Sequence, residues 1–343
     1  MRQRRHGWAF VRDVCRGVAC DVDLEIRKAY EKYPFPYAVD IDFLQYTPAR
    51  ARQELERFRL AHADLHRRTF GLAPDRLAGR IVWDLAAGTG WRALAMALDG
   101  PRELHAFEGS KKAVGFAQHF AQLLGIHNVS FQHLSLFDLA SFPHAQRPDL
   151  VFCTGALHHI FDLRRVVHAL ARCCREGTEF YFTHSSYRSI RGVLKYYKNW
   201  RCWAEGGSDL DRRLAAGERV WKSWVKSTPV SLRIDQINDL AGVLYVARSR
   251  EEITRLFREA RFDIEALPTV QGLSQHLESW REILLLPSSS SGKRLLKRTL
   301  RLGVDVLRAL PMPKPIDRAL GVSVAFLFEM RPYYFKAIYR GNG

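Results

Sequence analysis

The sequence predicts an α/β fold: a doubly wound, mostly parallel sheet with helices on both faces, an N-terminal helical cap and helical insertions. Two observations predict it. From residue 81 onward, short apolar runs typical of buried strands alternate with helical segments. The first strand–helix junction, DLAAGTG at residues 84–90, consists mostly of small residues, as a tight turn close to a ligand requires. We place the core of the fold at residues 79–186.

The elements of this core follow one another in a regular order. We expect strands at residues 80–86, 103–107, 128–137, 149–154 and 178–184, and helices at 91–98, 111–125 and 163–174. Ser110 and Asp162 precede two of the helices as N-caps, and Gly125 ends the first of these two. The alternation resumes with a helix at 250–260 and a strand at 261–267, and residues 332–340 can return as a last strand.

The segments around the core are predicted to be mainly helical. Residues 1–78 form the N-terminal cap, with helices at 22–33 and 48–71 that are separated by two prolines. Residues 187–230 are basic and aromatic, and we interpret them as a helical lid. Residues 231–270 complete the core, and residues 271–343 form a basic helical extension with the last strand.

Composition limits the classes of partner. The formal net charge of +17 fits RNA, an anionic membrane or an acidic substrate, but solvated charged faces explain it equally well. No apolar run reaches the ~20 residues that a transmembrane helix needs, and Arg12 and Arg16 interrupt the first apolar stretch, so we expect a cytoplasmic protein without a signal peptide. The six cysteines lack metal-ligand spacing; we expect reduced thiols and no metal.

Three acids stand at the ends of the first three strands, where a parallel sheet binds its ligands. Asp84 ends the first strand and can accept from a ligand ammonium; Glu108 ends the second and can accept from both hydroxyls of a ribose. Asp138 follows the third and can accept from an adenine amine. Gly88 and Gly90 allow the backbone to approach the ligand. Because GTGWRA also fits the dinucleotide fingerprint, the turn alone does not choose between NAD and other adenosine ligands.

The stretch VWDLAAGTG…FEGS…LFD…DLVFCTGALHHI…REGTEFYF is similar to the class I S-adenosylmethionine-dependent methyltransferases, closely over residues 79–186 and loosely over 231–266. The resemblance implies a Rossmann-like sheet of seven strands, the last antiparallel, and S-adenosyl-L-methionine as cofactor. It implies that Asp84, Gly88 and Gly90 bind the methionine end of the cofactor, that Glu108 binds its ribose, and that Asp138 binds its adenine.

Ala86 and Ala87 stand where that family often has Gly and Cys. We include Ala86 in the predicted cofactor site, where it needs a negative φ or carries a small local cost.

Two adjacent histidines follow the fourth strand in GALHHIFD, close to the transferred methyl group on such a fold. We predict His158 and His159 as catalytic candidates, with His158 facing the acceptor, because a neutral imidazole can serve as a base for a hydroxyl. The alternative for at least one of them is packing or helix capping. His184, after the fifth strand, is a third candidate.

Aromatic residues gather in two other stretches. Tyr30, Tyr33, Phe35 and Tyr37 either contact a sulfonium through cation–π attraction or dock the N-terminal helices on the sheet. The lid carries six more, which can stack RNA bases, line an acceptor pocket or pack the lid itself: Tyr196, Tyr197, Trp200, Trp203, Trp221 and Trp224. The basic helix 293–310 suits an anionic membrane surface, although packing on its own domain is the commoner use of such a helix.

The sequence therefore predicts a methyltransferase that acts on a hydroxyl or amine of a small molecule, either lipid-linked or a secondary metabolite. RNA is an alternative acceptor, and no DNA partner is expected. A nicotinamide-dependent oxidoreductase and a non-catalytic methyltransferase-like partner subunit are the other readings of the same residues.

Overall fold

The computed structural model describes residues 22–33, 46–73, 75–143, 147–185, 190–221, 237–246, 248–267 and 332–341, with the single residues 305, 313 and 316. The basic helix expected at 293–310, and the residues Phe35, Tyr37 and Trp224, lie outside this part of the chain. Contacts divide the chain into two units, and the elements described below belong to the first, except for the beginning of one helix, α7.

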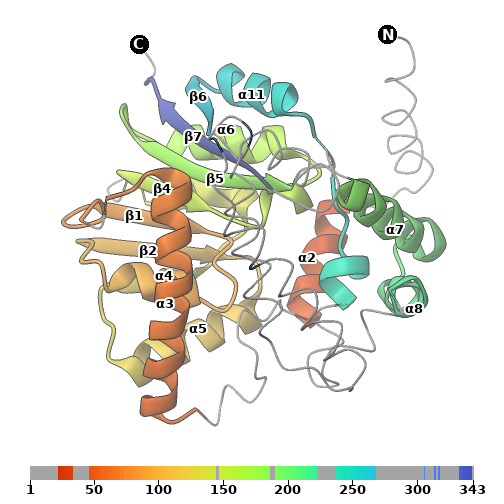
Figure 1. The fold of residues 1–343 in the computed structure, drawn as a ribbon, viewed down its shortest axis with the longest axis horizontal. Helices are drawn as coiled ribbons and strands as arrows, with labels where there is room; N and C mark the ends of the chain where they lie inside the picture. The colour runs from red at the N-terminus through yellow and green to blue at the C-terminus, as the bar shows by residue number, and fades with distance from the viewer. Residues whose placement is uncertain are drawn as a thin grey trace. The chain divides into compact units, whose positions relative to one another are not determined.

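One seven-stranded sheet forms the centre of the first unit (Figure 1). Its strands are β1 (Ile81–Leu85), β2 (Glu103–Glu108), β3 (Val129–His133), β4 (Leu150–Cys153), β5 (Glu179–Ser185), β6 (Phe262–Leu267) and β7 (Pro332–Tyr339). They lie in the order β3-β2-β1-β4-β5-β7-β6. Strands β1 to β5 are parallel, and β7 is antiparallel to both β5 and β6. The predicted fold class, including the antiparallel last strand, is confirmed.

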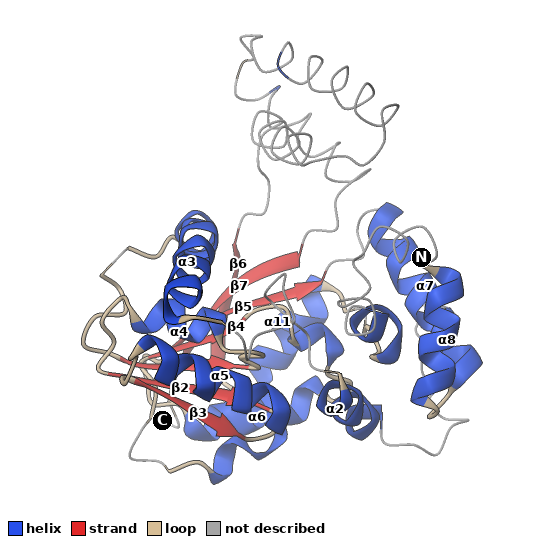
Figure 2. Cartoon of the chain, turned by 90° about the horizontal axis from the view of Figure 1, so that it is seen from below, coloured by secondary structure: helices blue, strands red, loops and turns tan. Residues whose placement is uncertain are grey.

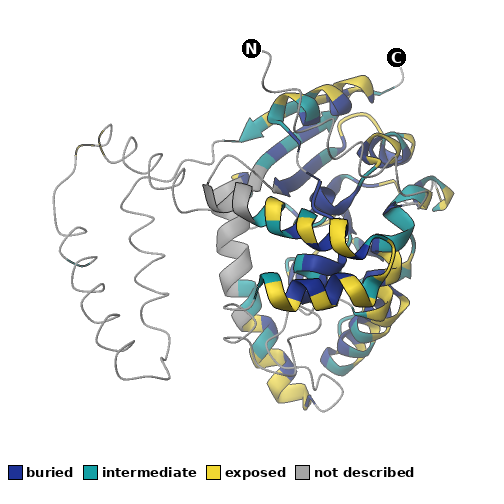
Figure 3. Cartoon of the chain, turned by 90° about the vertical axis from the view of Figure 1, so that its right-hand side faces the viewer, coloured by how far each residue is buried: buried dark blue, intermediate teal, exposed yellow. Residues whose placement is uncertain are grey.

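Helices cover both faces of this sheet (Figure 2). One face packs against α3 (Pro48–Phe70), α4 (Trp91–Ala97) and α5 (Lys111–Leu124), and the other against α6 (Leu163–Cys173) and α11 (Arg250–Glu259). Successive side chains of β1 point to opposite faces: Val82 packs on the side of α3, α4 and α5, and Trp83 packs on the side of α6 and α11. Because both faces are covered, every residue of β1 and β4 is buried. Figure 3 shows dark blue strand segments next to helices that carry yellow, exposed positions.

Local signals in the sequence set the ends of these helices. The Ser110 side chain accepts a hydrogen bond from the Ala113 N–H, and Asp162 accepts one from Arg165. Gly125 ends α5 at a φ of 67°. The third strand is shorter than expected, because the Ser135 side chain accepts from the Phe137 N–H and turns the chain into a 3₁₀ helix, η3 (Leu136–Ser141).

A group of helices lies together beside the sheet: α2 (Val22–Lys32), α7 (Ile190–Gly206) and α8 (Leu210–Val220), with the π-helix η6 (Asn238–Gly242) (Figure 1). Val22, Ile26 and Ala29 of α2 share one apolar cluster with Trp203 of α7 and with residues that follow η6. Gly217 lets α8 approach η6 closely, since a Cβ at this position would stand 2.5 Å from the Ala241 Cβ. Segments expected as cap, lid and core remainder are therefore packed on one another.

None of the helices that the structure describes is long and apolar enough to cross a bilayer.

Candidate functional site

The junction DLAAGTG forms a tight turn after β1, which we call the glycine turn (residues 84–90). Three of its residues have a positive φ: Ala86 at 53°, Gly88 at 57° and Gly90 at 85°. A side chain in this left-handed region costs roughly 1–2 kcal/mol, so Ala86 carries the local cost expected from the sequence. At Gly90 the need for glycine is also steric, because a Cβ would lie 2.6 Å from the Ala117 Cβ and 2.8 Å from Phe131.

The side chain of Glu108, at the end of β2, is fixed by hydrogen bonds, one of them from the glycine turn. Its Oε2 accepts a hydrogen bond of 2.7 Å from the Gly88 N–H, and its Oε1 accepts one of 2.9 Å from the Ser110 N–H. Burial raises the pKa of Glu108, and these N–H donors oppose the rise. Each carboxylate oxygen keeps a further lone pair, so the fixed group can still accept from a ligand hydroxyl.

Asp84, the first residue of the glycine turn, still belongs to β1 and is completely buried. Its Oδ1 accepts hydrogen bonds of 2.8 and 2.5 Å from Nε and Nη2 of Arg92 in α4. Arg92, itself 5% exposed, also donates to the Thr154 carbonyl oxygen at 3.1 Å and to the Thr154 hydroxyl. Burial raises the pKa of Asp84, and the Arg92 guanidinium opposes this rise. The pair joins the carboxyl ends of β1 and β4, where the strand order reverses.

Sequence reasoning missed Arg92. The signal was present, because a single charged residue stands in the otherwise apolar helix WRALAMA, eight positions after Asp84. Asp84 Oδ2 and Thr89 Oγ1 are buried and have no hydrogen-bond partner in the described part of the chain. Asp138 lies in the first turn of η3 with an exposed side chain.

The two histidines of GALHHIFD form a 3₁₀ turn, η5 (Leu157–His159), and both are buried. His159 Nδ1 lies 3.2 Å from the Leu244 carbonyl oxygen, and its Nε2 lies 3.5 Å from Asp239 Oδ1. Burial lowers the pKa of His159 to about 4 and that of His158 well below its ordinary value. Both rings are therefore neutral near pH 7. His158 Nδ1 is buried without a hydrogen-bond partner among the described residues.

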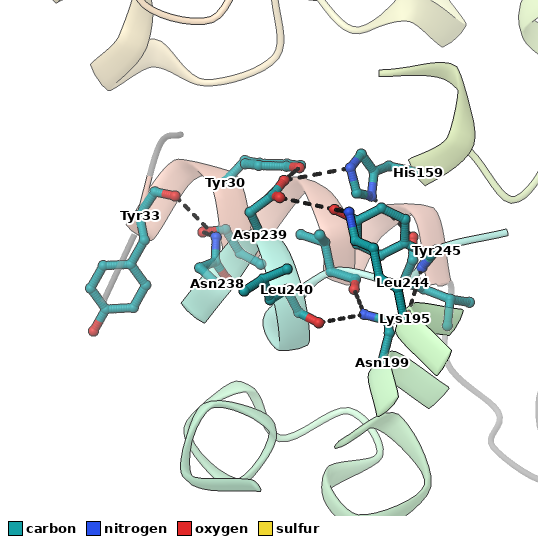
Figure 4. Close-up of polar contacts among 12 residues, drawn as sticks. Tyr30, Tyr33, His159, Lys195, Asn199, Asn238, Asp239, Leu240, Leu244 and Tyr245 are labelled. Carbon is teal, nitrogen blue, oxygen red and sulfur yellow. Dashed lines mark hydrogen bonds and ion pairs between the residues drawn. The ribbon is translucent and has the colours of Figure 1, made fainter. Parts of the chain in front are cut away.

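Beside these histidines lies a polar group that sequence reasoning did not find, the Asp239 cluster (Tyr30, His159, Lys195, Asp239 and Tyr245; Figure 4). Tyr30 donates to Asp239 Oδ1 at 3.0 Å, and Tyr245 donates to Asp239 Oδ2 at 2.9 Å. Lys195 Nζ donates to the Tyr245 Oη at 2.6 Å. The Tyr245 ring stacks on His158 with centroids 5.0 Å apart, which connects the cluster to the end of β4.

Residues 157–162, which we call the histidine turn, are hydrogen-bonded from two sides. The Asp23 carboxylate of α2 accepts from the N–H groups of Phe161 and Asp162 at 2.7 and 3.0 Å. From the other side, the Val246 N–H donates to the His158 carbonyl oxygen at 2.7 Å, and Arg248 donates to the carbonyl oxygens of residues 160 and 161. Further along α2, Glu31 accepts from the Lys111 N–H at 2.6 Å. Helix α2 thus reaches from the histidine turn to the start of α5.

Trp203 and Trp221 of the lid contact cations of this chain, and the lid residue Lys195 contacts the ring of Tyr245, which lies outside the lid. Lys195 Nζ lies 3.9 Å from the Tyr245 ring centroid, Lys198 Nζ lies 4.7 Å from that of Trp221, and the Arg213 guanidinium lies 4.1 Å from that of Trp203. Tyr30 of α2 points to Asp239. Tyr33, just after α2, packs against the apolar residues of α8 and η6, and Figure 4 shows it pointing away from the Asp239 cluster. Packing of the lid therefore accounts for much of its mixture of cations and rings.

A protein-family profile described as a methyltransferase domain matches residues 78–261. The chain belongs to this family. Its sheet has the seven strands and the antiparallel last strand that the resemblance to the class I S-adenosylmethionine-dependent methyltransferases implies. Among curated proteins, it is 34% identical over 99 residues to the uncharacterized methyltransferase YcgJ of Bacillus subtilis; the alignment covers 29% of this chain and 38% of YcgJ. The chain thus spans less than two thirds of that relative's length in the alignment.

Two solved structures illustrate the likeness in fold. The crystal structure of YcgJ is 19% identical, with a TM-score of 0.44, and the match covers 77% of this chain and 94% of that one. A geranyl diphosphate C-methyltransferase from Streptomyces coelicolor is 14% identical, with a TM-score of 0.47 and coverage of 94% and 98%.

Proposed function

We propose that this methyltransferase acts on a hydroxyl or amine of a small-molecule acceptor, which binds beside His158. The observation that carries the proposal is the enclosure of the histidine turn. Residues 157–160 are buried, and Asp23 of α2, Val246 and Arg248 hydrogen-bond to the backbone of residues 158–162. An enclosed site of this kind suits a small molecule, whereas an RNA strand needs an open surface with basic side chains along it.

The residues around the glycine turn fit the cofactor. The positive φ of Gly88 and Gly90 gives the tight backbone turn that such a ligand needs, and Glu108 is fixed with lone pairs to spare. We propose that Glu108 accepts from the ribose hydroxyls, that the exposed carboxylate of Asp138 accepts from the adenine amine, and that the backbone of Ala86, Gly88 and Gly90 holds the methionine end. Asp84, with Arg92 as its counter-ion, supports the backbone that holds the methionine end.

We assign His158 and His159 to the acceptor side. A neutral imidazole can donate or accept a hydrogen bond, and the buried Nδ1 of His158 is open for one to the acceptor. His159 supports the turn through the Leu244 carbonyl oxygen, 3.2 Å from its Nδ1. The cofactor supplies a methyl group that is already activated on a sulfonium, so the task of these residues is to hold the acceptor in line and exclude water.

Calorimetric titration with S-adenosylmethionine and S-adenosylhomocysteine, with NAD as a control, tests the cofactor site. We expect micromolar binding of the first two ligands and none of NAD. Glu108→Ala should weaken binding at least about 100-fold, because two hydrogen bonds to a charged group are lost. Absence of binding to the folded parent protein would contradict the proposed function and favour a non-catalytic partner subunit.

The acceptor class is tested with radiolabelled S-adenosylmethionine and two fractions of a cell extract. One fraction holds molecules below about 1 kDa, and the other holds total RNA. We expect label in the small-molecule fraction. Label that enters RNA and is released by ribonuclease would overturn the small-molecule assignment.

A further inference from the structure

We propose that Tyr245 is a catalytic residue, which takes the proton of a hydroxyl acceptor and passes its own phenolic proton to Asp239. This inference rests on the proposed function and deepens it, since it favours a hydroxyl over an amine. Neither residue belongs to the predicted site, and both come from the segment that follows the lid.

The position of Tyr245 places its hydroxyl on the acceptor side of the site. Its ring stacks on His158 at 5.0 Å and lies 4.4 Å from the His159 ring, measured between centroids. Both rings follow β4, whose carboxyl end adjoins the glycine turn across the strand-order reversal. An acceptor that bonds to His158 Nδ1 therefore lies next to the phenol.

A proton that leaves the acceptor needs a destination, and His158 is a poor one. Burial and the neighbouring His159 and Lys195 lower the pKa of His158, so an imidazolium is disfavoured there. The Asp239 carboxylate already accepts the Tyr245 proton in a hydrogen bond of 2.9 Å. Tyr245 Oη also accepts from Lys195 at 2.6 Å, and its second lone pair is left for an acceptor hydroxyl.

The step is balanced in protons and charge. The acceptor O–H proton moves to Tyr245 Oη while the Tyr245 proton moves to Asp239 Oδ2. The acceptor oxygen keeps the electron pair of its O–H bond and uses one pair to bond the methyl carbon, while the electron pair of the broken sulfur–carbon bond would stay on the cofactor's sulfur and neutralise the sulfonium. Asp239 ends as a neutral carboxylic acid, Tyr245 is restored, and the proton returns to water when the product leaves. The described groups that face Asp239 are Tyr30 of α2, His159 of η5, and Tyr245, which follows η6. Lys195 of α7 lies behind Tyr245 and donates to its hydroxyl.

The cluster contains its own control, because two phenols donate to the same carboxylate at nearly equal distances. We expect Tyr245→Phe to lower the rate of methyl transfer to the small-molecule fraction at least about 100-fold, as loss of a general base does. Tyr30→Phe should lower it less than about 5-fold. Both variants should bind S-adenosylhomocysteine within about 2-fold of the parent. Equal losses in the two variants would reduce the cluster to a structural role and overturn the proposal.

A second readout needs no acceptor. Tyrosine labelled with ¹³C at Cζ reports phenol ionisation by NMR, and Tyr245→Phe identifies the Tyr245 signal. Burial and then the Asp239 charge raise the pKa of Tyr245 well above 10. Asp239→Asn keeps a hydrogen-bond acceptor but removes the charge, so we expect it to lower the Tyr245 pKa. An unchanged Tyr245 pKa in Asp239→Asn would overturn the proposed proton transfer from Tyr245 to Asp239. Failure of the proposed function is a different result: the parent protein would not bind the cofactor.

Discussion

The glycine turn and the Asp239 cluster lie at the same edge of the sheet but are built in opposite ways. The glycine turn comes from one short stretch, and its partners Arg92 and Glu108 follow within 24 residues of Asp84. The Asp239 cluster takes its side chains from α2, η5, α7 and the segment 239–245, which span more than 200 residues. A local site depends on a few exact contacts, whereas a dispersed site depends on the docking of whole helices.

The largest effect expected in the glycine turn comes from the buried pair. Arg92→Met leaves the Asp84 charge buried without its counter-ion, which should lower the free energy of unfolding by about 3 to 5 kcal/mol. Urea denaturation measures this loss. The double variant Asp84→Asn/Arg92→Met removes the charge as well and should recover much of it. A single variant as stable as the parent would show that Asp84 is not ionised against Arg92.

The dispersed site should respond to pH. His159 has a pKa of about 4 in the folded chain, so only the unfolded chain binds its proton between pH 6.5 and 4. This difference in proton binding is absent above pH 6.5. As the pH falls from 6.5 toward 4, it lowers the free energy of unfolding by up to about 3 kcal/mol.

Urea denaturation at pH 7.5, 6 and 5 measures this loss. His159→Gln should make stability less dependent on pH in this range, whereas His127→Gln, at an exposed position, should change the dependence little. If both variants behaved as the parent does, the burial of His159 in solution would be in doubt.

The smallest effect concerns the backbone of the glycine turn. Ala86→Gly relieves the cost of a φ of 53° but adds freedom to the unfolded chain. We expect a net gain of about 0.5 kcal/mol in the free energy of unfolding, with S-adenosylhomocysteine binding equal to or slightly tighter than that of the parent. Ala87→Gly is the matched control, because no positive φ is recorded at residue 87, and it should destabilise. Destabilisation by both substitutions would contradict the left-handed conformation of Ala86.

The prediction of the fold from the sequence succeeded where local signals decide. The caps Ser110 and Asp162 and the end at Gly125 formed as expected, because each depends on residues within one helical turn. The third strand was predicted too long, since the apolar residues of LSLF suggested a strand and the Ser135 hydrogen bond turned the chain instead. Assignment of individual residues to the cofactor stays a prediction, including the role of Asp138.

By itself, the sequence determined the class of this protein. The order of apolar strands and amphipathic helices specifies a parallel sheet, and small residues next to acids at strand ends predict where an adenosine ligand binds. These properties depend on neighbours in the chain. Only the tertiary structure decided that Arg92 is the counter-ion of Asp84, and that Tyr30, Lys195 and Tyr245 meet around Asp239. No periodicity records those contacts, because they arise when α2, α7 and η6 bury their apolar faces together and bring distant polar side chains with them.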